Sequence, residues 1–106
     1  MLRTFGSILR SRMRTRDLVA RWGGEEFAAI LFRATLEEAM RIADGIRRQL
    51  AESALVGADG EPLLATVSAG CAAMGPDTET AEQLLRAADV ALYMAKRAGR
   101  DRVCAA

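Results

Sequence analysis

The chain has no histidine and only two cysteines in its 106 residues. Cys71 and Cys104 lie in separate strand-like segments, without the CxxC spacing that is typical of metal and redox sites. The sequence therefore argues against a disulfide framework and against a zinc site. We expect both cysteines to be buried, reduced thiols.

A long apolar run is also missing. No stretch approaches the roughly 20 apolar residues that span a bilayer, and the N-terminal residues lead into arginines rather than into the apolar core of a signal peptide. Hydrophobic residues nonetheless make up 51% of the chain, enough for the core of one small domain over residues 1–106. These features predict a soluble, cytoplasmic domain that does not insert into a membrane.

The net charge of the chain is small, but its charged residues are unevenly distributed. The net charge is +1, yet residues 1–22 carry six arginines and one aspartate, a net charge of +5 that leaves −4 for the rest of the chain. A nucleic-acid-binding domain would combine such a basic face with aromatic base readers and with a pI above the value of 7.8 found here. We therefore expect no nucleic-acid partner and interpret most of these arginines as a solvated helix face.

Hydrophobic periodicity alternates between helix and strand along the chain. Thr35 and Thr80 each begin a capping box, and Gly99 is a natural helix stop. The expected helices cover residues 2 to about 13, 36 to about 52 and the stretch between Thr80 and Gly99, and the expected strands cover residues 18–22, 27–32, 63–73 and 102–104. This order predicts an α/β (α+β) fold with an antiparallel-rich central sheet flanked by helices.

The segment with the strongest chemical signal is the expected hairpin tip, where residues 23–27 read GGEEF. Paired glycines tolerate the positive φ of tight hairpin turns and let the backbone approach a ligand. Glu25 and Glu26 then sit on a rigid element, where carboxylates can carry a Mg²⁺ ion that bridges to substrate phosphates. The alternative is that both carboxylates simply solvate an exposed turn at a sheet edge.

Three further segments, in the same order as in one known family, accompany the tip. Arg14 to Asp17 fit an RxxD motif, residues 67–70 resemble a T-hydrophobic-S-hydrophobic-G strand, and residues 88–102 closely resemble ADxALYxAKxxGRNR. Together with residues 23–27, these segments resemble the GGDEF family, diguanylate cyclases that join two GTP molecules into cyclic dimeric GMP. The resemblance covers the C-terminal two-thirds of that domain and implies a nucleotidyl cyclase, palm-like fold.

The resemblance implies a site for GTP and Mg²⁺, with Mn²⁺ as a possible replacement. The implied roles are phosphate admission by Gly23 and Gly24, metal coordination by Glu25, support of the same site by Glu26, and phosphate contacts by Lys96 and Arg100. For these last two cations, an alternative from physical chemistry alone is that they complement the dipole at the C-terminus of their helix.

The same resemblance implies that Arg14 and Asp17 form a product-binding, inhibitory site away from catalysis. An arginine fork can grip guanine edges or phosphate oxygens, and the acid can receive guanine N–H donors. The alternative is an ion pair on the surface, spaced i to i+3. The helix arginine that often completes this site falls on Gly45, and Arg41 or Arg48 is a candidate substitute.

The chain departs from the family at its beginning. Nothing before Leu2 supplies the first strand with its metal-binding aspartate, or the FKxxND-like segment that recognises guanine. We therefore expect little or no cyclase activity from this chain alone, an unpaired edge at the strand ending at Phe32, and a homodimer. A sensor domain in a longer protein is a further expected partner. Two other functions stay open, a receptor for cyclic dimeric GMP and a non-catalytic dimerisation module.

Overall fold

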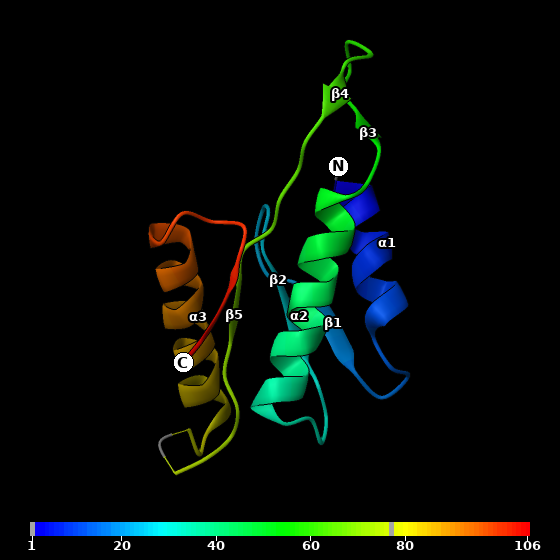
Figure 1. Cartoon of the computed structure of the whole chain (residues 1–106). Helices are drawn as coiled ribbons and strands as arrows, with labels where there is room; N and C mark the ends of the chain where they lie inside the picture. The colour runs from blue at the N-terminus through cyan, green and yellow to red at the C-terminus, as the bar shows by residue number, and fades with distance from the viewer. Residues whose placement is uncertain (1, 77) are drawn as a thin grey trace.

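Helices and short strands alternate through the computed structural model, which describes residues 2–76 and 78–106 (Figure 1). The helices are α1 (Leu2–Arg12), α2 (Leu36–Ala51) and α3 (Ala81–Arg97). The strands are β1 (Leu18–Arg21), β2 (Phe27–Ile30), β3 (Leu55–Val56), β4 (Pro62–Leu63), β5 (Ala69–Cys71) and β6 (Val103–Ala105). The predicted α/β alternation is confirmed. None of the helices in these two ranges is both long and apolar enough to cross a membrane.

Both predicted capping boxes are present. The Thr35 hydroxyl accepts from the Glu38 amide at 3.1 Å, and the Glu38 carboxylate accepts from the Thr35 amide at 3.2 Å. Thr80 and Gln83 exchange the same two hydrogen bonds at the start of α3. Each cap satisfies amides that the first helical turn leaves unpaired and stabilises its helix by about 1 kcal/mol.

The strands pair in three separate ladders. β1 pairs with β2 and β3 with β4, both antiparallel, while β5 pairs with β6 in parallel. The prediction of one antiparallel-rich central sheet is therefore wrong for the described residues, as is the single strand over residues 63–73. Within that stretch only Leu63 and Ala69–Cys71 lie in ladders, because the extended chain between them has no neighbouring strand to accept its hydrogen bonds.

The largest core cluster lies between α1 and α2. Its buried members are the aliphatic residues Ile8, Leu9, Ile46, Leu50 and Ala65. The β1–β2 hairpin is attached to this cluster by Phe27, whose ring centroid lies 5.0 Å from that of Phe5. Phe27 therefore anchors the hairpin in the core.

On the other side of the molecule, α3 packs against β5 at very short range (Figure 1). A Cβ atom built on Gly70 would overlap backbone atoms of Ala88 and Leu92, so no larger residue fits in β5 at that position. Ala91 and Ala95 have no exposed surface. Small residues on both elements therefore fix how far α3 stands from β5.

The two cysteines lie on adjacent strands, Cys71 in β5 and Cys104 in β6. Both are free thiols and only partly buried, so the expected burial is incomplete. Partial burial disfavours the thiolate and raises the pKa of the Cys71 thiol.

Candidate functional site

The tip of the β1–β2 hairpin is a short loop held by its own hydrogen bonds. The Glu26 carbonyl accepts from the amides of Trp22 at 2.8 Å and Gly23 at 3.2 Å. The Arg21 guanidinium donates to the Gly24 carbonyl at 2.6 Å and to the Gly23 carbonyl at 3.4 Å. Arg21 is a site residue that the sequence did not reveal, because an arginine beside a turn looks like any other surface charge.

The paired glycines do not have the backbone conformation that the sequence predicted. Among the described glycines, positive φ occurs at Gly60 and Gly99 and not at Gly23 or Gly24. The connection between Trp22 and Glu26 is long enough to reverse the chain without a left-handed glycine. Nothing lies within 4 Å of a Cβ atom built on Gly23 or Gly24, so the glycines leave open space beside the loop.

Polar groups at the tip point to unfilled positions. The amides of Gly24 and Glu25 make no hydrogen bond to any described residue. The Glu25 side chain is exposed and has no partner among residues 2–76 and 78–106. Adjacent unpaired backbone amides form a ready cradle for phosphate oxygens.

The end of α3 meets this tip. The Lys96 ammonium lies 3.4 Å from the Glu26 carboxylate, although the two residues are 70 positions apart in sequence. The side chains of Lys96 and Glu26 are 37% and 44% exposed, so the pair is accessible to a ligand. Arg100 follows just beyond the end of α3, exposed and without a side-chain hydrogen bond or ion pair among the described residues.

The two best-defined surface grooves lie away from the tip. One surface groove lies beside Tyr93 and Arg97 on α3, and another lies between α1 and α2. Neither groove includes a residue of the tip. A ligand held only by the tip would remain exposed on its other side.

The donor set at the tip suits a magnesium ion shared with a ligand. Glu25 and Glu26 offer hard carboxylate oxygens, and the described residues contain no group of three or more histidine, cysteine or acidic residues placed to hold a metal. Mg²⁺ characteristically uses one or two carboxylates together with phosphate oxygens and water. The two carboxylates therefore fit part of such a site, and phosphates must complete it.

Arg14 and Asp17 form a closed cluster at the opposite end of β1. One Asp17 oxygen accepts from the Arg14 amide at 3.0 Å and from its Nε at 2.9 Å. The other accepts from Arg14 Nη2 at 3.0 Å and from the Phe32 amide at 3.3 Å. The Asp17 side chain has no exposed surface. The hydrogen bond from Arg14 holds the pKa of Asp17 at about 2. The i to i+3 ion pair of the alternative is present at 2.9 Å, but its carboxylate is buried rather than on the surface.

This cluster leaves Arg14, not Asp17, accessible to a ligand. Both Asp17 oxygens are already occupied by two hydrogen bonds each, whereas the Arg14 side chain is 33% exposed. Arg14 Nη2 also donates to the Phe32 carbonyl at 2.9 Å. Asp17 thus holds the Arg14 guanidinium in place and ties it to the end of β2.

The groove between α1 and α2 shows what occupies the position of the expected helix arginine. A Cβ atom built on Gly45 would overlap the guanidinium of Arg12, which reaches across from α1 and donates to Gln49 at 2.9 Å. Arg41 and Arg48 also line this groove, but Arg48 is paired with Asp44. The guanidinium that lies over Gly45 therefore comes from α1.

Comparison with known proteins shows the family to which the chain belongs. Residues 1–102 match the family described as "Diguanylate cyclase, GGDEF domain". Diguanylate cyclase DgcP of Pseudomonas aeruginosa is 41% identical over 103 residues, which are 97% of this chain and 15% of that protein. The curated relatives that the chain matches are longer, and the chain spans 29% of one protein of Bacillus subtilis.

Two solved structures are similar over nearly the whole chain. The coiled coil and GGDEF domain of DgcB from Caulobacter crescentus, in complex with c-di-GMP, matches with a TM-score of 0.91 and 32% identity, over 99% of this chain and 56% of that one. The active GGEEF domain of a diguanylate cyclase from Vibrio cholerae matches with a TM-score of 0.85 and 30% identity, over 98% of this chain and 65% of that one.

Proposed function

The chain belongs to the GGDEF family of diguanylate cyclase domains, and we propose that its hairpin tip and the end of α3 form one half of a site that condenses two GTP molecules into cyclic dimeric GMP. One observation carries the proposal most directly. Lys96 and Glu26, from two segments far apart in sequence, meet at 3.4 Å beside two unpaired amides. That arrangement offers donors and a cation to phosphate oxygens, with a carboxylate for a metal.

Each group at the tip has a distinct part in this proposal. Gly23 and Gly24 leave room for the triphosphate, and the amides of Gly24 and Glu25 donate to its oxygens. Lys96 and Arg100 neutralise phosphate charge, Arg100 as a planar fork and Lys96 as a point charge. Glu25 and Glu26 would hold Mg²⁺ together with the phosphates, and the bound ion would offset charge on the transferring group.

The open tip is consistent with a reaction between two copies of the domain. When two tips face each other, each supplies one GTP and covers the exposed side of the other. The 3′-hydroxyl of each nucleotide then attacks the α-phosphate of the other in line, and pyrophosphate leaves. The protein contributes chiefly by holding the two nucleotides in that orientation. A homodimer in the cytoplasm, where GTP is present, is part of the proposal, as is a sensor domain elsewhere in the protein.

The test is production of cyclic dimeric GMP from labelled GTP and Mg²⁺ by the natural full-length protein. Wild type is expected to form the product, and Glu25→Ala is expected to form none. Glu61→Ala is the matched control, because Glu61 is an exposed glutamate at the far β3–β4 turn. Undiminished synthesis by Glu25→Ala would show that the proposal is wrong.

A second candidate function is binding of cyclic dimeric GMP at the Arg14 end. Its support is the fixed, one-third-exposed Arg14 fork, with Arg12 lying over Gly45 on the neighbouring helix. Guanidinium forks suit both guanine edges and phosphodiesters. In this candidate, Asp17 acts by holding Arg14.

Calorimetry with cyclic dimeric GMP tests this second function. Arg14→Ala is expected to lose binding, while Arg3→Ala, which removes an exposed arginine on α1, keeps it. Circular dichroism checks that each variant is folded. Equal affinity in wild type and Arg14→Ala, or no binding by either, discards the candidate.

A further inference from the structure

The turn that follows α3 has an unusual backbone. Three successive residues, Gly99, Arg100 and Asp101, have φ angles of +125°, +63° and +47°. Left-handed conformations are disfavoured for residues with a Cβ atom, and they cluster at functional sites where the surroundings hold them in place. Two such residues in succession, one of them a proposed phosphate ligand, require a structural explanation.

The helix end explains only the glycine. The Gly99 amide donates to the Lys96 carbonyl at 3.4 Å, and the Arg100 amide donates to the Ala95 carbonyl at 3.0 Å. This pair of bonds is the Schellman motif, which places a left-handed residue one position beyond the helix cap. The motif makes no demand on the φ angles of Arg100 and Asp101.

Contacts from other elements hold these two residues. The Asp101 amide donates to the Ser68 hydroxyl at 3.2 Å, and the Asp101 carboxylate accepts from Arg47 of α2 at 3.0 Å. The Arg102 side chain donates to the Arg100 carbonyl at 3.0 Å. The backbone on both sides of Arg100 Cα is therefore bonded, while the Arg100 side chain makes no hydrogen bond or ion pair with the described residues.

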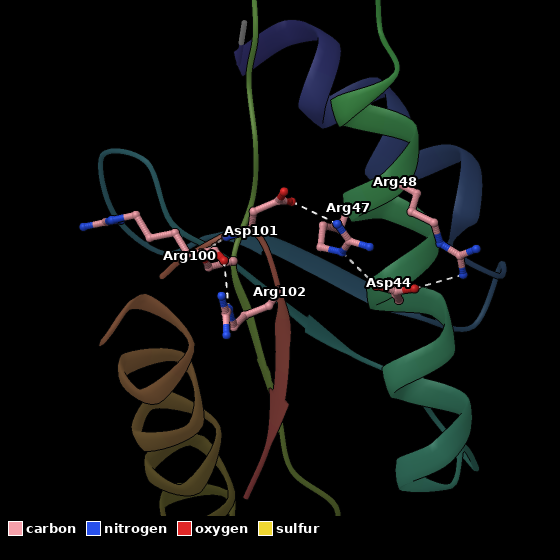
Figure 2. Close-up of polar contacts among 7 residues, drawn as sticks. Asp44, Arg47, Arg48, Arg100, Asp101 and Arg102 are labelled. Carbon is pink, nitrogen blue, oxygen red and sulfur yellow. Dashed lines mark hydrogen bonds and ion pairs between the residues drawn. The ribbon is translucent and has the colours of Figure 1, made fainter. Parts of the chain in front are cut away.

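Figure 2 shows the directions in which the Asp101 and Arg100 side chains extend. The Asp101 side chain extends toward Arg47 on α2, and the Arg100 side chain extends to the opposite side, away from α2. We propose that Arg47, acting through Asp101, is a positioning residue that fixes the direction of the Arg100 side chain for phosphate binding. This inference rests on the proposed function, in which Arg100 binds a phosphate of GTP.

Asp44 binds Arg47 and also Arg48, and Arg48 therefore serves as a control. One Asp44 oxygen accepts from Arg47 Nε at 2.8 Å, and the other accepts from Arg48 Nη2 at 2.9 Å (Figure 2). Only Arg47 continues to Asp101. Arg47 and Arg48 are thus neighbouring arginines on one helix that share a carboxylate partner, and they differ in whether they reach the turn.

At position 101 this chain differs from the family motif that residues 88–102 resemble. The segment resembles ADxALYxAKxxGRNR, with Asp101 in the place of asparagine. Both residues tolerate the left-handed region, so the backbone conformation itself does not require the change. The carboxylate gives Arg47 a charged acceptor, whereas an asparagine amide would offer a neutral acceptor and a weaker hydrogen bond.

The experiment measures affinity for inorganic tripolyphosphate with Mg²⁺ by calorimetry on this chain. This probe presents the triphosphate group without guanine. Arg100→Gln is expected to weaken binding about tenfold, because it removes a charged hydrogen-bond donor. Arg47→Gln is expected to weaken it by up to about fivefold, the upper end of the effect of losing a partly exposed ion pair, and Arg48→Gln is expected to leave it unchanged.

Two further variants separate positioning from a general loss of stability. Arg47→Gln in an Arg100→Gln background should cause no additional loss, because Arg47 acts through Arg100. Arg47→Lys keeps the charge beside Asp101 and should recover part of the affinity. Arg47→Gln loses its pairs with Asp44 and Asp101 and Arg48→Gln loses one pair with Asp44, so the melting temperature should fall slightly more in Arg47→Gln, with both variants folded at the temperature of the binding experiment.

The outcomes show whether the phosphate role of Arg100 is wrong or only the positioning role of Arg47. If wild type does not bind the probe, or Arg100→Gln binds as well as wild type, the phosphate role of Arg100 is wrong and the inference falls with it. If Arg100→Gln weakens binding while Arg47→Gln behaves like Arg48→Gln, only the inference is overturned. An additive loss in the double variant also overturns it.

Discussion

The two ends of β1 carry two acidic motif residues in opposite environments. At one end Asp17 is fully buried and accepts four hydrogen bonds from Arg14 and Phe32. At the other end Glu25 is exposed, beside unpaired amides and glycines with empty space around them. A strand of four residues separates a closed polar cluster from an open one.

The difference shows which motif the fold itself uses. Polar groups that are satisfied within the chain contribute to stability, and a ligand could reach them only by breaking those bonds. Polar groups held rigidly without partners contribute little to stability and stay available. We therefore expect changes at the Asp17 end to act on folding and changes at the tip to act on binding.

The largest expected effect compares two glycines, one packed and one open. Gly70→Ala would drive a Cβ atom into the backbone of α3, and we expect a loss of about 3 kcal/mol in the free energy of unfolding. Gly24→Ala meets no atom within 4 Å, so it should not destabilise the chain but should weaken tripolyphosphate binding. Urea denaturation and calorimetry measure the two effects. A destabilised Gly24→Ala would show that the tip is not open.

The next largest effect comes from removing one carboxylate at each end of β1. Asp17→Ala leaves the Phe32 amide and the Arg14 guanidinium without their shared acceptor, and the melting temperature should fall by several degrees. Glu25→Ala removes an exposed side chain and should change stability by no more than about 0.5 kcal/mol. Differential scanning calorimetry makes the comparison, and equal losses in the two variants would contradict it.

The pH dependence of the free energy of unfolding provides a further test of the role of Asp17. Because the pKa of Asp17 is about 2 in the folded chain and 3.8 ordinarily, its contribution to stability is complete above about pH 4 and is lost as the pH falls toward 2. Asp17→Asn should lack that part of the pH dependence. Unfolding followed by circular dichroism between pH 2 and 6 checks this, and parallel curves for Asp17→Asn and wild type would be contrary to the expectation.

The smallest expected effect on stability concerns Lys96. Its pair with Glu26 is well exposed at both side chains and should be worth less than about 1 kcal/mol. Lys96→Gln should therefore leave the melting temperature almost unchanged while weakening tripolyphosphate binding about tenfold. Arg97→Gln, one residue along on α3 and stacked near Tyr93, is the control. A large loss of stability in Lys96→Gln, with binding intact, would show that the pair stabilises the fold and does not bind the ligand.

Local signals in the sequence predicted the elements well. The two capping boxes and the helix stop at Gly99 follow from short-range patterns, and all three are present. Helix and hairpin boundaries lie within two residues of the predicted ones. These features depend on residues a few positions apart, which periodicity and capping preferences capture.

The features that the sequence missed depend on distant contacts. Whether residues 64–68 pair depends on a neighbouring strand, which alternation alone cannot reveal. The ion pair between Arg47 and Asp101 joins residues 54 positions apart, and the fit of Arg12 over Gly45 depends on how α1 crosses α2. The motifs identified the tip and the Asp17 end, but only the three-dimensional contacts distinguish the open one from the closed one.

The most direct test of the central claim is the magnesium dependence of GTP binding, measured by calorimetry for wild type and Glu25→Gln. If Glu25 shares a metal with the triphosphate, Mg²⁺ should tighten GTP binding to wild type and have little effect on Glu25→Gln. The same gain from Mg²⁺ in both proteins would contradict the account.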